Sequence, residues 1–185
     1  MILLNITVQN IRTNYTVSGE GEDVLILHGW GSNLTVHNQM AAYLAPHYRV
    51  YALDMPGFGE TPEPPAAWDV DHYVDFVLEF IREMGIRSVI LIGHSFGGRV
   101  IIKMVTRQNL SVTFPKLILI DSAGILPKKT LKQKCKIRIY KLGKKILNIS
   151  IVKKLYPDAL EKMRAKSGSA DYNAASPLMR QVLVK

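Results

Sequence analysis

The feature that most constrains this chain is the stretch SVILIGHSFGGRVII at residues 88–102. Its first half is a run of aliphatic residues that is too short for a typical helix and stops at Gly93. A second, amphiphilic run begins behind the pair Gly97 and Gly98. The pattern predicts a buried parallel strand, a very tight turn and a helix, with Ser95 at the apex of the turn.

The spacing Gly93-x-Ser95-x-Gly97 has a physical reason. A serine on so sharp a turn has a strained backbone, and its near neighbours must be small so that the strand and the helix can pass without Cβ clashes. The turn also places the hydroxyl of Ser95 at the N-terminus of the helix, where the backbone N–H groups favour developing negative charge. The simpler alternative is a serine that only caps the helix.

Two further segments favour a nucleophile over a cap. An apolar strand at residues 24–28 runs into the glycine-flanked loop His28-Gly29-Trp30-Gly31, and a strand at residues 48–53 is followed by Asp54-Met55-Pro56-Gly57-Phe58-Gly59. In this order and at these separations, the three motifs resemble the α/β-hydrolase family over roughly residues 20–125. The capped esterase-like and proline-iminopeptidase-like members are the most similar.

The resemblance implies a serine hydrolase that cleaves ester, amide or related acyl bonds through an acyl-Ser95 intermediate. The backbone N–H groups of Trp30 and Phe96 would form its oxyanion hole. His28 and Gly29 would shape the loop of the substrate pocket and His94 would flank the nucleophile. The partner it implies is a small-molecule acyl substrate.

Strands and helices are expected to alternate after an opening hairpin. This order is typical of an α/β fold with a doubly wound, mostly parallel sheet and a site at the carboxyl ends of the strands. The strands expected are residues 2–8, 11–17, 24–28, 48–53, 88–93 and 116–121, and the helices are residues 36–45, 70–84 and 96–108.

Two of these helices are predicted from the spacing of their apolar residues. Asp69 is expected to cap the helix at 70–84 and Gly85 to end it. The apolar positions are Val36, Met40, Tyr43 and Leu44 in the first helix, and Val70, Tyr73, Val74, Val77, Phe80, Ile81 and Met84 in the second.

The composition changes after residue 126. Residues 127–166 contain fourteen Lys or Arg and two Asp or Glu. The net charge of this stretch, fourteen minus two or +12, exceeds the net charge of +9 of the whole chain. Apolar residues recur at helical spacing through this stretch, so basic amphipathic helices broken near Gly143 and Pro157 are expected. We therefore divide the chain into a core at residues 1–125 and a basic helical segment at 126–185, which the resemblance implies is the start of a cap.

The charge of the basic segment has two interpretations. It could attract an anionic substrate, an acidic membrane surface or nucleic acid. It could also be the solvated face of helices that pack on the core, and we favour this second interpretation. Nucleic acid is disfavoured because no binding motif is recognised and aromatic residues are sparse among the lysines.

All five histidines, at positions 28, 37, 47, 72 and 94, precede Ser95. The family places its catalytic histidine after the nucleophile, so this sequence is expected to be the N-terminal part of a longer hydrolase whose activity is impaired here. Asp54 is interpreted as a turn residue, and Asp121 is the candidate acid. One alternative is that His37 or His72 takes the role of the missing base. The other is a non-catalytic module that binds a small ligand.

Several expectations concern partners and location. The strand at 116–121 would form an exposed apolar edge, covered by the C-terminal helices of the chain, by a second copy or by a missing fragment. The single Cys135 and the absence of a basic leader or a long apolar run favour a cytoplasmic protein. No metal-ligand cluster and no nucleotide-binding motif occurs in the sequence, so neither a metal nor a cofactor is expected.

Overall fold

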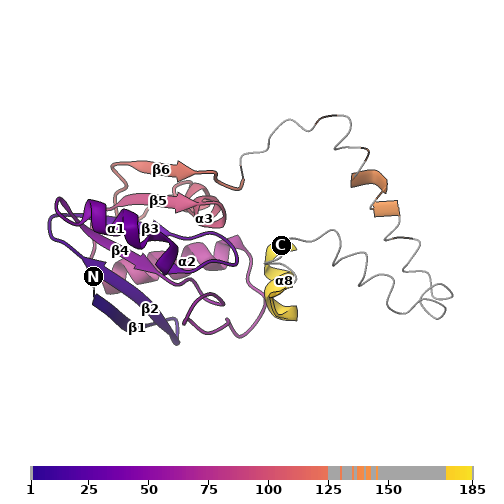
Figure 1. The fold of residues 1–185 in the computed structure, drawn as a ribbon, viewed down its shortest axis with the longest axis horizontal. Helices are drawn as coiled ribbons and strands as arrows, with labels where there is room; N and C mark the ends of the chain where they lie inside the picture. The colour runs from indigo at the N-terminus through magenta and orange to yellow at the C-terminus, as the bar shows by residue number, and fades with distance from the viewer. Residues whose placement is uncertain are drawn as a thin grey trace. The chain divides into compact units, whose positions relative to one another are not determined.

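A six-stranded sheet organises the chain in a computed structural model (Figure 1). The structure describes residues 2–124 and 174–184, together with the separate positions 130, 135, 137–139, 141, 142 and 145. The strand order is β1-β2-β4-β3-β5-β6. The strands are β1 (Ile2–Val8), β2 (Ile11–Ser18), β3 (Glu22–Leu27), β4 (Tyr48–Leu53), β5 (Ile90–His94) and β6 (Leu117–Ile120).

The sheet opens with the predicted hairpin. β1 and β2 pair in antiparallel register from Ile2 opposite Val17 to Val8 opposite Ile11. Gln9 and Asn10 connect them with φ angles of 50° and 63°. Two successive left-handed residues form the turn whose twist matches that of the flanking strands, which confirms the predicted turn.

The strand pairs that involve β3 and β5 are parallel, and most residues of β3 and β5 are buried. β3 lies between β4 and β5, and β5 pairs with β6 in parallel register. Leu25 and Leu91 contribute to the larger core cluster, whereas Ile26 and Ile92 contribute to the smaller one. Because successive side chains of a strand point to opposite faces, the two clusters lie on the two faces of the sheet.

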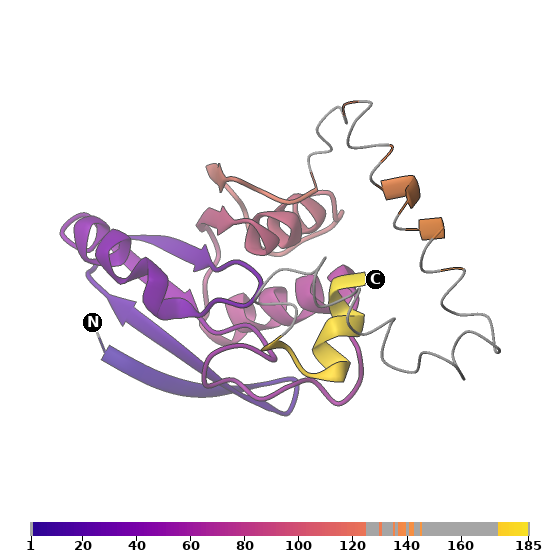
Figure 2. The same ribbon diagram turned by 45° about the vertical axis from the view of Figure 1, so that its right-hand side comes forward.

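Helices cover both faces. The 3₁₀ turn η1 (Leu34–His37) and α1 (Asn38–Leu44) supply Leu34 and Ala41 to the smaller cluster. α2 (Val70–Glu83) and α3 (Phe96–Met104) pack side by side in the larger cluster, on the other face (Figures 1 and 2). The predicted doubly wound, mostly parallel α/β sheet is therefore confirmed.

The sequence predicts α2 correctly at both ends. The carboxylate of Asp69 accepts a hydrogen bond from the backbone N–H of His72, and the His72 side chain returns to the N-cap backbone in a capping box. Gly85 follows the helix with a φ angle of 68°. Six residues of the helix are buried, five of them predicted and Phe76 in addition: Tyr73, Val74, Phe76, Val77, Phe80 and Ile81.

Two predictions about helices were wrong in detail. The helix expected at 36–45 begins instead as the 3₁₀ turn of η1, which has about three residues per turn. Val36 and Tyr43 are consequently 60% and 82% exposed, and Leu34 and Ala41 form the buried face. The helix after the tight turn at Ser95 ends at Met104 rather than at residue 108, and the hydroxyl of Thr106 donates to the Lys103 carbonyl just beyond its end. We call the end of β5, Ser95 and the start of this helix, residues 93–98, the elbow.

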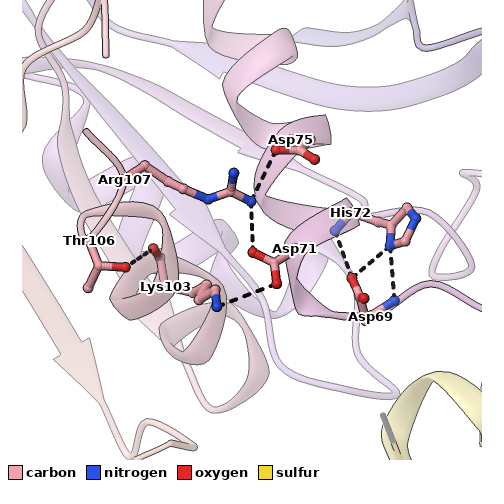
Figure 3. A network of polar contacts seen from close by, with 7 residues as sticks. All are labelled: Asp69, Asp71, His72, Asp75, Lys103, Thr106 and Arg107. Atoms are coloured by element: carbon pink, nitrogen blue, oxygen red, sulfur yellow. Dashed lines mark hydrogen bonds and ion pairs between the residues drawn. The ribbon is translucent and has the colours of Figure 1, made fainter. Parts of the chain in front are cut away.

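An ionic network joins α2 to the end of α3 (Figure 3). The guanidinium of Arg107 lies 2.7 Å from Asp71 Oδ1 and 3.3 Å from Asp75 Oδ1, and Lys103 Nζ lies 3.4 Å from Asp71 Oδ2. These side chains are 36–55% exposed. Water and salt therefore screen the pairs.

We expect replacement of Arg107 by alanine to lower the free energy of unfolding by less than about 1 kcal/mol, because exposed ion pairs contribute little. Urea unfolding at low and moderate salt measures the change. A loss of more than about 2 kcal/mol would show that the network holds α2 against α3.

The chain forms two compact units, residues 1–125 with 175–185, and residues 126–174. The predicted division placed 175–185 with the basic segment, but α8 (Pro177–Val184) packs with the core. Met179 and Val182 are 2% and 3% exposed and belong to the larger cluster, and Ser176 Oγ accepts a bond from Met179 N. The helices expected around Gly143 and Pro157 lie outside the described residues.

β6 is the last strand of the described sheet and lies at its edge (Figure 1). Its four apolar side chains, Leu117, Ile118, Leu119 and Ile120, are 37–45% exposed. The predicted exposed edge is thus present. Among the residues that the structure describes, no helix has the length and apolar character needed to cross a membrane.

Candidate active site

Ser95 lies where β5 ends and α3 begins. Its φ and ψ angles are 48° and −108°, outside the regions that a non-glycine residue usually adopts. As the residue before the first turn of α3, it places its side chain at the positive end of the helix. Non-glycine residues held in such conformations cluster at functional sites, so the strain itself marks Ser95.

The glycines around Ser95 are required by close backbone contacts. A Cβ atom on Gly93 would lie 2.7 Å from the Cα of Gly98. A Cβ atom on Gly97 would lie 2.7 Å from the carbonyl oxygen of His28 and would overlap that of Leu27. The strand, the turn and the helix can therefore pass one another only without side chains at these positions.

We expect replacement of Gly97 by alanine to cost about 2 kcal/mol of stability, because the new methyl group meets backbone atoms of β3 that cannot move aside. Thermal or urea unfolding measures the loss. Gly85→Ala serves for comparison, because an added Cβ there has no atom within 4 Å and its cost comes only from the left-handed φ of 68°, which Gly97 in α3 does not share. Unchanged or increased stability in Gly97→Ala would show that close packing does not exclude a side chain there, because alanine is otherwise favoured over glycine within a helix.

The loop after β3 is held by His28. The ring is fully buried, and its Nε2 accepts a hydrogen bond from the backbone N–H of Met55 at 3.0 Å. Nδ1 must then carry the proton, which it donates to the carbonyl of Gly29 at 2.7 Å. Burial lowers the pKa of His28 to about 4, partly offset by the bond to Gly29 and by Asp54. His28 is therefore neutral at pH 7 and both of its nitrogens are occupied.

Two backbone N–H groups of this region are free among the described residues. Phe96 is the first residue of α3, so its N–H has no carbonyl in a preceding turn. The N–H of Trp30 donates no hydrogen bond within the described chain. The loop that carries Trp30 is bound to the elbow by the hydrogen bond from Gly97 N to the His28 carbonyl at 3.0 Å.

Asp54 ties the loop after β3 to the loop after β4. It is 1% exposed, and its Oδ1 accepts from Leu34 N at 2.7 Å. Its Oδ2 accepts from Asn14 Nδ2 at 2.8 Å and from Glu60 N at 3.0 Å. Asp54 thus has the structural role that the sequence predicted for it, because its carboxylate is occupied by donors from three segments.

The other histidines lie differently around the site. The rings of His37 and His94 meet at 6.2 Å between centroids, and burial, followed by the neighbouring His94, lowers the pKa of His37. Nε2 of His37 is buried without a hydrogen-bond partner in the described structure. His94 also packs on Gly29, where an added Cβ would lie 2.8 Å from its Nδ1. His72 caps α2 and is exposed.

Asp121 follows β6 at the same level as Ser95, because His94 pairs with Ile120 in the parallel register. Its φ angle of 44° makes it a second left-handed non-glycine residue at this end of the sheet. The side chain is exposed, and the structure brings no histidine to it among the described contacts. The structure places the candidate acid beside the nucleophile strand but joins the two by no side-chain bond.

Aromatic residues surround the elbow on the side of α2. The ring of Phe96 lies 5.8 Å from that of Trp30, 6.4 Å from Phe58 and 5.1 Å from Tyr73. The Tyr73 hydroxyl donates to the Pro56 carbonyl at 2.9 Å, and burial raises the pKa of Tyr73. α8 lies beside the loop after β4 in both views (Figures 1 and 2), and a Cβ on Gly57 would overlap the end of its Met179.

Sequence reasoning missed the residues that support the site from a distance. Asn14 binds Asp54 from β2, and Ser122 Oγ donates to the Gly93 carbonyl at 3.4 Å. Neither residue belongs to a motif, so no local signal could have found them. In the described part of the chain, no three His, Cys, Asp or Glu residues lie together as metal ligands would.

The family of the chain follows from its similarity to a protein-family model. Residues 24–172 match the model described as the alpha/beta hydrolase family. The chain belongs to this family. The match contains the β3 loop, the Asp54 loop and the elbow of Ser95, which are the three motifs that carried the resemblance in the sequence.

Relatives whose names state an activity are similar to part of this α/β hydrolase. It is 34% identical over 109 residues to the pimeloyl-[acyl-carrier protein] methyl ester esterase of Vibrio cholerae, which covers 59% of this chain and 40% of the esterase. It is 33% identical over 119 residues to the (E)-2-((N-methylformamido)methylene)succinate hydrolase of Acinetobacter baylyi, with 64% of this chain and 43% of that hydrolase covered.

A solved structure agrees with the fold. The crystal structure described as a membrane phospholipase A, a novel bacterial virulence factor, superposes with a TM-score of 0.65 at 31% sequence identity. The alignment covers 70% of this chain and 42% of the phospholipase. The chain thus spans less than half the length of these relatives.

Proposed function

We propose that this α/β hydrolase cleaves esters or related acyl bonds through an acyl intermediate on Ser95. The observation that carries the proposal is the conformation of Ser95, a non-glycine residue with φ 48° between the carboxyl end of β5 and the first turn of α3. A strained serine at this position presents its hydroxyl for attack while the helix end stabilises negative charge.

The first step is attack of Ser95 Oγ on the acyl carbonyl carbon. A bond forms between Oγ and this carbon, and the carbonyl electrons move to oxygen, whose negative charge would be bound by the N–H groups of Trp30 and Phe96. Collapse of the intermediate expels the alcohol or amine, which needs a proton, and leaves the acyl group on Ser95. Water then releases the acid.

The proton of the Ser95 hydroxyl requires a base. His28 has both nitrogens bonded and a pKa of about 4, which removes it from this role at neutral pH. His72 is bonded to the cap of α2. We propose that a water molecule takes this proton and that the leaving group recovers a proton from solvent, which makes turnover slow. Asp121 lies beside the nucleophile strand as the candidate acid.

A carboxylic ester is the substrate class that the relatives support best. The name of the Vibrio cholerae relative is that of a methyl ester esterase, and the solved relative is a phospholipase A, which are both ester-cleaving activities. The aromatic rings of Trp30, Phe58 and Phe96 beside the elbow would accommodate an apolar acyl group.

A second candidate function is non-catalytic binding of a small hydrophobic ligand at the same site. The observation that favours it is that His28 has both ring nitrogens bonded and His72 caps α2, so that neither is available to Ser95 as a base. The two functions differ in the fate of the ligand, since only the hydrolase would convert an ester.

Turnover of p-nitrophenyl acetate by the full chain tests the proposal. We expect slow release of p-nitrophenol that disappears in Ser95→Ala, whereas Ser111→Ala, which changes an exposed serine outside the elbow and the loop after β3, keeps it. Absence of release, or equal release by Ser95→Ala, would overturn the proposed function and leave the binding module.

A further inference from the structure

The end of β6 and the residues after it form hydrogen bonds with the backbone of Ser95. The N–H of Ser95 donates to the carbonyl of Ile120 at 3.1 Å, and the N–H of Ala123 donates to the carbonyl of Ser95 at 2.9 Å. Both peptide groups around the nucleophile are therefore bonded to residues 120–123. A change in the conformation of residues 120–123 is expected to shift the backbone of Ser95 through these hydrogen bonds.

The side chain of Ser122 adds a third contact with the elbow. Its hydroxyl donates to the carbonyl of Gly93 at 3.4 Å and lies in the space left by the absent side chain of Gly98. A Cβ on Gly98 would lie 2.5 Å from Ser122 Cβ and would overlap its Oγ. Ser122 therefore touches the elbow on the strand side and on the helix side of Ser95.

Two non-glycine residues with positive φ angles follow the neighbouring strands β5 and β6, and each of these backbone conformations costs free energy. Ser95 has a φ angle of 48° and Asp121 one of 44°, and they follow strands that pair in parallel register. Such residues persist only where surrounding contacts hold them. The contacts that hold Ser95 are its two backbone bonds to residues 120–123, a third from Arg99 N to the Ser95 carbonyl at 3.2 Å, and the side chain of Ser122.

We propose that Ser122 is a positioning residue for the nucleophile, which holds Ser95 in its strained conformation through Gly93 and Gly98. The proposal rests on the proposed function of Ser95. Because Ser122 orients the attacking atom and is not proposed to contact the substrate, its loss should slow the chemical step and leave substrate binding unchanged.

The test is a cycle of variants in the full chain, measured with p-nitrophenyl acetate. We expect Ser122→Gly to lower kcat about fivefold to tenfold without changing KM, which corresponds to one neutral hydrogen bond. Gly98→Ala should lower kcat further, because its methyl group displaces Ser122. The double variant should regain the kcat of Ser122→Gly, since the colliding side chain is gone.

Gly97→Ala combined with Ser122→Gly is the matched control. The added methyl group there meets the carbonyl oxygens of Leu27 and His28, so removal of the Ser122 side chain should give no rescue. Urea midpoints of all variants establish that each is folded. Wild-type kcat in Ser122→Gly, an effect on KM alone, or no rescue of Gly98→Ala would overturn the proposal.

Failure of the proposed function gives a different result, because the wild-type chain would then release no p-nitrophenol. Ser95→Cys in a Cys135→Ser background still reports the orientation of position 95 through its alkylation by iodoacetamide. We expect addition of Ser122→Gly to slow this alkylation about fivefold. An unchanged rate would overturn the positioning role in the absence of turnover.

Discussion

Replacement of Asp54 by alanine should lower the free energy of unfolding by about 4 kcal/mol. The carboxylate is buried and accepts hydrogen bonds from Asn14 Nδ2, Leu34 N and Glu60 N. Alanine leaves these donors without an acceptor, and each unsatisfied buried donor costs about 1–3 kcal/mol. Urea unfolding at pH 7 measures the loss.

Asp69→Ala is the control for this prediction. Asp69 also accepts a backbone hydrogen bond, but it lies at the exposed N-cap of α2, where such a change costs about 1 kcal/mol. Equal losses in the two variants would show that burial of Asp54 does not determine its contribution. The loops after β3 and β4 would then be held together by other contacts.

Acid should destabilise the protein between pH 6.5 and pH 4, and His28 should cause much of the loss. The folded state keeps this ring neutral with a pKa of about 4, whereas the unfolded chain binds a proton near the ordinary value of 6.5. Stability from His28 is therefore complete above pH 6.5 and is lost as the pH falls toward 4. The pKa difference between the folded and unfolded chains corresponds to about 3 kcal/mol in the free energy of unfolding.

The free energy of unfolding as a function of pH, compared between wild type and His28→Gln, measures this contribution. The variant has no imidazole at position 28, so its profile should be flatter by about 3 kcal/mol over this interval. His47→Gln, which changes an exposed histidine, is the control and should follow the wild-type profile. Parallel profiles for wild type and His28→Gln would refute the prediction.

The buried strands and the turns could be predicted because their signals are local. Apolar runs give β3 and β5, a mostly apolar segment gives β4, and Asn10 in the turn after β1 is a residue that tolerates the left-handed conformation. Gly93 indicated the elbow because the clash that it avoids is with Gly98, which the strand–turn–helix pattern already brings close, whereas the clash that Gly97 avoids is with Leu27 and His28 of another segment.

The contacts that support the site could not be predicted in this way. Asn14 is 40 residues from Asp54, and only the pairing of β2 with β4 brings their side chains within 2.8 Å. Ser122 reaches Gly93 because β6 pairs with β5. The return of α8 to the core likewise depends on Met179 fitting above Gly57, which no periodicity encodes.

The helix at residues 34–44 shows how a periodicity can mislead. Val36 and Tyr43 have the spacing of an apolar face, yet both are exposed. The bond from Leu34 N to Asp54 fixes the start of η1, and this contact, rather than the apolar pattern, decides which residues face the sheet. A tertiary hydrogen bond here overrides the local signal.

The most direct test of the account is the mass of the intact chain before and after exposure to a fluorophosphonate, with Ser95→Ala treated in parallel. The account predicts one slowly formed adduct on the wild-type chain, located at Ser95 by peptide mapping and absent from the variant. A folded chain that forms no adduct, or an adduct that persists in Ser95→Ala, would contradict the claim that Ser95 is the nucleophile of this α/β hydrolase.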